Sequence, residues 1–123
     1  MELTVILDPA EQACCGEALT LGQQVVWQLA YATRGAEPYY MRDQHELFSH
    51  QGATVRPVAG RIVGIRELRI HASRADGTPV RRVWRSIPSV PQGTDYDSDG
   101  LEVVMLVDDS TQLPELFSWP HRR

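Results

Sequence analysis

The chain has 123 residues, a formal net charge of −4, 42% hydrophobic residues and 23% charged residues. These values are typical of one globular domain, and they exclude a disordered, collagen-like or disulfide-dense chain. No apolar run approaches the ~18 residues that a membrane-spanning helix needs, so we expect no membrane partner.

Arginine supplies all 12 basic side chains, and the chain contains neither lysine nor asparagine. This usage indicates a GC-rich bacterial genome. Each guanidinium is permanently charged and suited to bidentate pairing with carboxylate or phosphate. The first residues lack the cationic and apolar regions of a secretory signal, so we expect a cytoplasmic protein. In that compartment the adjacent Cys14 and Cys15 are expected to be free thiols.

Alternating apolar residues predict the strands of the N-terminal half. A first strand over residues 3–7 ends at Asp8-Pro9, and a second covers residues 25–31, with Trp27 on its core face. The polar stretch between them is predicted to be a loop. Residues 32–53 are either a long loop or a short helix that begins at Pro38.

Three further strands are predicted in the C-terminal half. The longest lies within residues 54–72, where one slip in the alternation indicates a bulge near Gly64 to Glu67. Asp76-Gly77 is typical of a hairpin turn, and residues 80–87 return as a strand. A loop over residues 88–100 leads to a last strand over 101–107.

The expected fold is therefore mostly β, a small five-stranded meandering barrel of the SH3-like or OB-like type with at most one short helix. Residues 1–123 form a single domain in this interpretation, with an irregular tail from about residue 110.

The sequence around the two cysteines resembles a family of small actinobacterial proteins without an assigned activity. Its N-terminal signature is C-C-G followed by V-G-x-x-V-x-W. Here the matching residues are Cys14-Cys15-Gly16, Leu21-Gly22, Val25 and Trp27, and the sequence departs from the pattern at Ala18 and Gln23. The resemblance implies a bacterial source and gives no mechanism.

The same cysteines suggest a zinc site. Two thiolates and two imidazoles satisfy tetrahedral zinc, and His45 and His50 have the five-residue spacing of a histidine pair. Neighbouring side chains diverge, however, so the alternative is an ordinary pair of thiols, one buried and one partly exposed.

A second candidate metal site lies in the acidic loop. Asp95, Asp97 and Asp99, followed by Gly100, match the D-x-D-x-D-G start of a calcium-binding loop. The position that needs a bidentate glutamate is Leu106. The alternative is an acidic, solvated turn between strands.

A block of arginines is the most pronounced charge feature. Residues 54–86 contain eight arginines and two acidic residues, whereas both flanking segments are acidic. Pairing of the two strands in this block would form a basic ribbon with one surface tryptophan. Its predicted contact residues are Arg61, Arg66, Arg69, Arg81, Arg82, Trp84 and Arg85. Such a ribbon fits an acidic protein partner or a nucleic acid, unless the acidic segments neutralise it within the molecule.

These features favour a non-enzymatic binding or interaction module that uses the arginine-rich ribbon for an acidic partner. The alternatives are a zinc- or thiol-dependent protein centred on Cys14 and Cys15, and a small barrel that binds nucleic acid. The chain has no G-x-S-x-G, no H-E-x-x-H and no glycine-rich phosphate loop, and we expect no cofactor besides the metals considered above.

Overall fold

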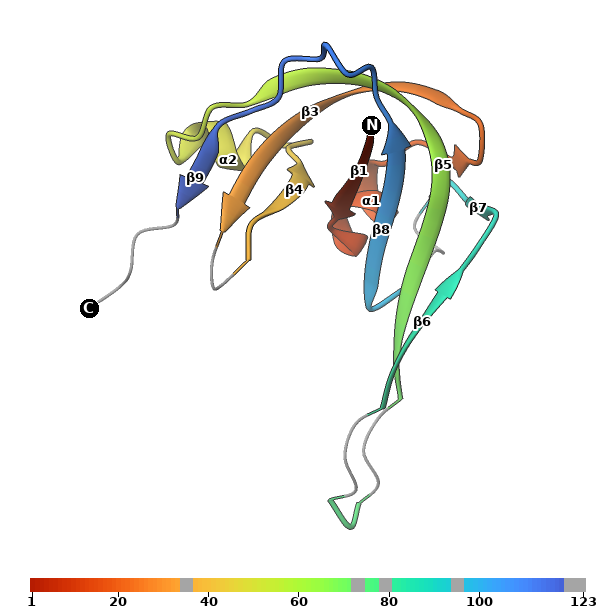
Figure 1. The fold of residues 1–123 in the computed structure, drawn as a ribbon. Helices are drawn as coiled ribbons and strands as arrows, with labels where there is room; N and C mark the ends of the chain where they lie inside the picture. The colour runs from red at the N-terminus through yellow and green to blue at the C-terminus, as the bar shows by residue number, and fades with distance from the viewer. Residues whose placement is uncertain (34–36, 72–74, 78–80, 94–96, 119–123) are drawn as a thin grey trace, which may run out of the picture.

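The computed structural model of the protein describes residues 1–33, 37–71, 75–77, 81–93 and 97–118 (Figure 1). Most of them lie in strands, which confirms the predicted class. The elements in chain order are β1 (Glu2–Leu7), α1 (Pro9–Cys15), β2 (Leu19–Thr20), β3 (Gln24–Thr33), β4 (Tyr39–Arg42), α2 (Leu47–His50), β5 (Arg56–His71), β6 (Arg81–Ser86), β7 (Ser89–Val90), β8 (Gly100–Leu106) and β9 (Leu116–Ser118).

Five strands form a closed barrel in the order β5-β8-β1-β4-β3, and pairing between β3 and β5 closes it. The five-stranded barrel was predicted, but its strand order is not a simple meander, because β1 lies between β8 and β4. The five strands of the barrel are also not the five strands that were predicted. The predicted strand at residues 80–87 is β6, which pairs with β5 outside the barrel, and β4 takes its place.

The barrel core follows the alternation of the sequence. Val5, Trp27, Leu29 and Val103 are among the buried inward-facing side chains, and the core also takes in Leu19 and Val90 from the separate pair of β2 and β7. Trp27 is 2% exposed, so its predicted place in the core is confirmed. Burial of these apolar groups is the main contribution to the free energy of folding.

A bulge in β5 changes which residues face inward. The register against β8 shifts between Ile62 and Gly64, so Val63 is the extra residue. Before the bulge Ile62 is buried, and after it Ile65 and Glu67 are buried. The predicted bulge is therefore present, one residue before the predicted range, and it directs the Glu67 side chain inward.

Both helices lie in stretches that the sequence left as loop or ambiguous. Residues 9–15 were predicted to be loop, but Asp8 caps α1 by accepting a hydrogen bond from the Ala10 N–H at 2.8 Å, and Pro9 occupies the first turn. In the stretch from Pro38 onward the structure has β4 first and only then the short α2. No helix in the described residues is long and apolar enough to cross a membrane.

Short strands also occur in the two remaining irregular stretches. β7 lies in the predicted loop over residues 88–100 and pairs with β2. β9 lies in the predicted tail and pairs in parallel with the end of β3.

Substitution of two isoleucines on β5 tests which side chains face the barrel core after the bulge. Ile65 is 1% exposed in the barrel, whereas Ile70 is 39% exposed. We expect Ile65→Ala to lower the free energy of unfolding by about 2–5 kcal/mol, because it leaves a cavity in the core, and Ile70→Ala to lower it by less than about 1 kcal/mol. Urea denaturation followed by circular dichroism measures both. Equal losses for the two variants would contradict this register.

Candidate functional site

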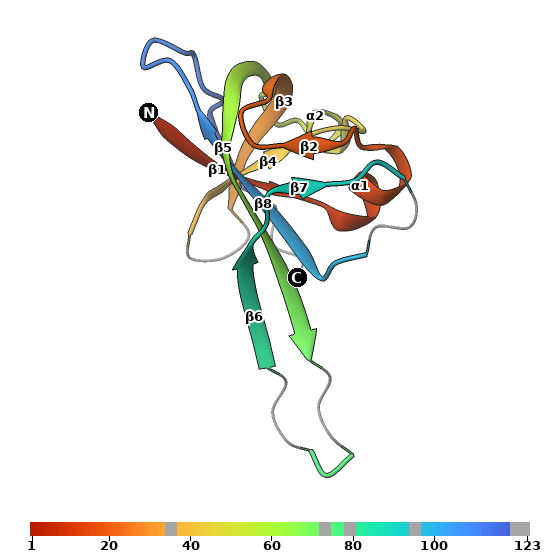
Figure 2. The same cartoon turned by 90° about the vertical axis from the view of Figure 1, so that its right-hand side faces the viewer.

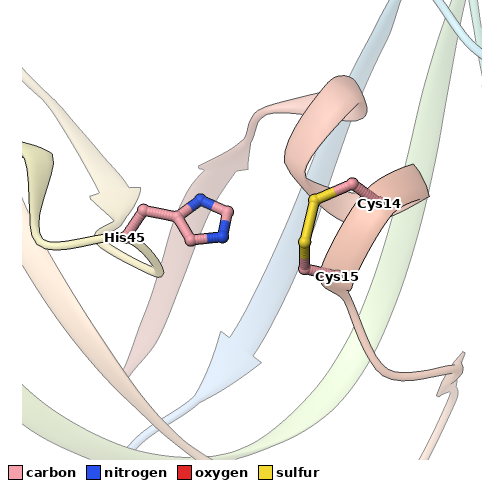
Figure 3. Close-up of side chains that lie close together, drawn as sticks. All are labelled: Cys14, Cys15 and His45. Atoms are coloured by element: carbon pink, nitrogen blue, oxygen red, sulfur yellow. A yellow bond between two sulfur atoms is a disulfide. The ribbon is translucent and has the colours of Figure 1, made fainter.

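Cys14, Cys15 and His45 lie together at the end of α1 (Figure 3). One ligand atom from each residue lies within 4.8 Å of the other two, and all three residues are exposed. The two cysteines are joined in a disulfide. The expectation of two free thiols is therefore wrong for this state of the protein. In a disulfide neither sulfur is a thiolate, and only thiolates bind zinc strongly.

The topology of the barrel explains why these residues meet. β1 and β4 are parallel neighbours, with Val5 opposite Tyr40 and Ile6 opposite Met41. The segments that follow two parallel strands leave the sheet at the same end. α1 follows β1, and the loop that carries His45 follows β4.

Two contacts position the His45 loop against α1. The Nδ1 atom of His45 lies 3.0 Å from Oε1 of Glu11, and the Gln44 side-chain amide donates a hydrogen bond to the Cys15 carbonyl at 2.8 Å. Figure 3 shows the His45 ring turned toward the sulfurs. Sequence reasoning missed Glu11, which lies one helical turn before the cysteines and would have been found had α1 been recognised.

The other predicted zinc ligand, His50, lies elsewhere. It is exposed at the end of α2, with its Nε2 atom 3.7 Å from Oε2 of Glu46. Asp43 orients this helix, since its carboxylate accepts hydrogen bonds from the N–H groups of Phe48 and Ser49. The structure thus brings together three of the four predicted ligands.

A cleft of about 250 Å³ opens beside this cluster. Its polar walls come from Asp8, Glu11, Arg42 and Asp43, and its apolar walls come from Tyr39, Met41, Leu47 and Phe48. Nη1 of Arg42 is buried and has no hydrogen-bond partner among the described residues. Glu11 belongs both to the cleft and to the contact with His45, so the two features are adjacent.

Glu17 fastens the segment after α1 to the barrel. Its carboxylate accepts a hydrogen bond from the Trp27 indole at 2.8 Å and pairs with Arg42 at 3.1 Å. The Arg42 guanidinium also lies 4.5 Å from the centre of the Trp27 ring. Partial burial acts to raise the pKa of Glu17, but the hydrogen bonds from its own backbone, from Trp27 and from Arg42 outweigh it, and the pKa lies below its ordinary value.

The predicted arginine ribbon corresponds to a projecting hairpin, which we call the arm: residues 66–71 of β5 together with β6. It extends away from the barrel in both views (Figures 1 and 2). The predicted hairpin is confirmed by the pairing of β5 with β6, and Gly77 in its turn has a φ of +83°.

The arginines nearest the barrel are engaged within the molecule. Arg85 contacts the buried Glu67 carboxylate at 2.7 Å, and Arg69 lies 3.6 Å from its other oxygen. Arg66 pairs with Glu102 of β8 at 2.8 Å. Internal neutralisation therefore applies to this half of the ribbon.

The outer arginines differ. Arg81 and Arg82 are exposed and form no ion pair within the part of the chain that the structure describes. Trp84 is 39% exposed, as expected of a surface aromatic, and the Arg66 guanidinium lies 5.1 Å from its ring centre. Arg61 is not on the arm. It lies before the bulge, opposite Leu106 of β8.

The acidic loop lies at the base of the arm. Asp99 accepts a hydrogen bond from the Ile70 N–H at 2.6 Å, and its own N–H donates to the Leu68 carbonyl at 3.1 Å. Asp97 is exposed, and Asp95 lies outside the described residues. The loop is flanked by β7 and β8 rather than by helices. Asp99 therefore connects the loop to β5, and calcium binding stays a prediction.

The lowered pKa of Glu17 gives a stability test. Its contribution is fully present above the ordinary pKa of about 4.5 and is lost as the pH falls through the lower value of the folded state. We expect Glu17→Gln to be less stable than the wild type at neutral pH and this difference to shrink under acid. Urea denaturation between pH 7 and pH 3 measures it, with the exposed Glu2→Gln as the control for the loss of one charge. A difference that grows under acid would contradict the interpretation.

Comparison with known proteins places this architecture in a family. No curated protein and no solved structure gave a significant match to the chain. Residues 1–110 match DUF6578, described as a family of unknown function. This range includes the barrel strands, both helices, the Cys14–Cys15–His45 cluster and the arm. The chain therefore belongs to DUF6578, a family of unknown function.

Proposed function

We propose that the protein is a non-enzymatic binding module whose arm binds an acidic segment of a partner protein. One observation carries the proposal: Arg81 and Arg82 lie on a hairpin outside the barrel, exposed and without an ion pair among the described residues. Guanidinium groups in this state can form bidentate hydrogen bonds with carboxylates without first breaking an internal pair.

The arm offers apolar contact beside this charge. In the β5–β6 register, Arg66 lies opposite Ser86, and the pairs Leu68–Trp84 and Ile70–Arg82 follow on the same face. Trp84 and Ile70 are each 39% exposed. Tryptophan and arginine are among the residues enriched at the energetic centres of protein interfaces. A partner segment that alternates acidic and apolar residues would match this face.

The charge distribution favours a protein partner over a nucleic acid. Glu67 and Glu102 neutralise the inner arginines, and the acidic loop with Asp97 and Asp99 lies at the base of the arm. A phosphate backbone needs an extended positive field, which these acids interrupt. An isolated acidic segment needs only Arg82 and the apolar side chains of Ile70 and Trp84 on the same face of the arm.

The test uses a fluorescein-labelled peptide of alternating glutamate and leucine, titrated with the full chain and followed by anisotropy. We expect binding that weakens as salt rises and that Arg82→Glu weakens about tenfold. Arg61→Glu is the matched control, because it reverses the same charge at an exposed position of β5 away from the arm. We expect it to change the affinity less than about twofold.

Three results would overturn the proposal. Equal weakening by Arg61→Glu and Arg82→Glu would mean that only the overall charge matters. Tighter binding of a labelled oligothymidylate than of the peptide would favour the nucleic-acid alternative. Absence of binding to either probe at low salt would exclude both functions of the arm.

A further inference from the structure

Cys14, Cys15 and His45 at the end of α1 supply the donor atoms of a metal site. While the disulfide is present, the two sulfurs cannot act as thiolate ligands. We propose that, after reduction, Cys14, Cys15 and His45 bind one Zn²⁺, and that re-formation of the disulfide releases it. This inference is independent of the proposed function of the arm, which lies on a different pair of strands.

The geometry removes the main objection to adjacent cysteines as ligands. Side chains of neighbouring residues usually diverge, but at this helix end both sulfurs lie together and face the same imidazole (Figure 3). Ligand atoms of a tetrahedral zinc ion lie about 3.5–3.8 Å apart. The three donors already lie within 4.8 Å of one another, so small side-chain rotations suffice once the sulfurs are no longer bonded.

Glu11 decides which histidine nitrogen is available. The Glu11 carboxylate lies 3.0 Å from Nδ1 of His45, so the Nδ1–H group donates a hydrogen bond to this carboxylate. The other ring nitrogen, Nε2, is then left to bind the metal. A carboxylate that holds the far nitrogen of a ligating histidine fixes the ring and makes it a stronger ligand. Glu11 is thus a positioning residue, and water completes the tetrahedron at this exposed site. Two thiolates and one imidazole suit Zn²⁺ better than Mg²⁺ or Ca²⁺.

The redox step requires a dithiol as the reductant. One of its thiolates attacks a sulfur of the Cys14–Cys15 disulfide, and its second thiol resolves the mixed disulfide, so two electrons pass to the protein. The products are two cysteine thiols and the oxidised dithiol. Binding of Zn²⁺ then displaces the two thiol protons. Thiol–disulfide exchange with an oxidised dithiol reverses the sequence and frees the metal.

Cobalt is the probe, because thiolate-bound Co²⁺ absorbs in the near ultraviolet and tetrahedral Co²⁺ absorbs in the visible. The full chain is reduced with dithiothreitol, desalted without oxygen and titrated with Co²⁺. We expect one Co²⁺ per reduced chain, displacement by Zn²⁺, and no such bands with the oxidised chain. Cys14→Ser leaves only the Cys15 thiolate and should weaken both the thiolate band and the affinity, and Glu11→Gln should weaken the affinity about 10–100-fold.

His50→Ala is the matched control for His45→Ala, since both histidines are exposed and each lies beside a glutamate. We expect His45→Ala to weaken Co²⁺ binding by at least about tenfold and His50→Ala to leave it unchanged. Circular dichroism checks that each variant is folded. The proposal is overturned if the reduced chain gives no thiolate-to-cobalt band, or if both histidine variants bind as the wild type does.

Discussion

The rest of the structure depends on β5, because this one strand both closes the barrel and builds the arm. Residues Arg56–Arg61 pair with β3, and residues from Arg66 to Leu68 pair with β8 on one side and β6 on the other. The base of the arm is therefore three strands wide. The bulge at Val63 makes this double use possible, because it keeps Ile62 and Ile65 in the core on either side of the irregularity.

A direct consequence of the bulge is the burial of Glu67, which determines what the arginines do. Glu67 is 2% exposed, and its buried carboxylate needs compensating charge. Arg85 supplies it through a hydrogen bond from Nε at 2.8 Å and an ion-pair contact from Nη2 at 2.7 Å. Counting charges along the sequence treats these arginines as equivalent. In the folded chain Arg85 compensates a buried acid, whereas Arg82 faces solvent at the sheet edge, where a charge also hinders strand addition by another molecule.

Alternation made β1, β3 and β8 predictable, since one face of β1 and of β8 is buried and β3 alternates as far as Leu29 and Ala30, which are both buried. The elements that were missed have weaker patterns. β4 has four half-buried residues and no alternation, so only its pairing with β1 and β3 defines it. α1 had local signals in Asp8 and Pro9, but its seven residues are too few to show a helical period. His50 was grouped with His45 by spacing alone, and α2 separates them.

The location of the cysteine–histidine cluster follows from chain topology rather than from any motif. β1 and β4 are the parallel neighbours within the barrel, so α1 and the His45 loop leave it at the same end. Three contacts then fix the geometry: the Asp8 cap starts the helix, Glu17 holds the chain after it to Trp27, and Gln44 bonds the Cys15 carbonyl. None of these contacts uses a sulfur atom. The contacts that hold His45 beside the cysteines are therefore separate from the disulfide, as the proposed replacement of the disulfide by a metal ion requires.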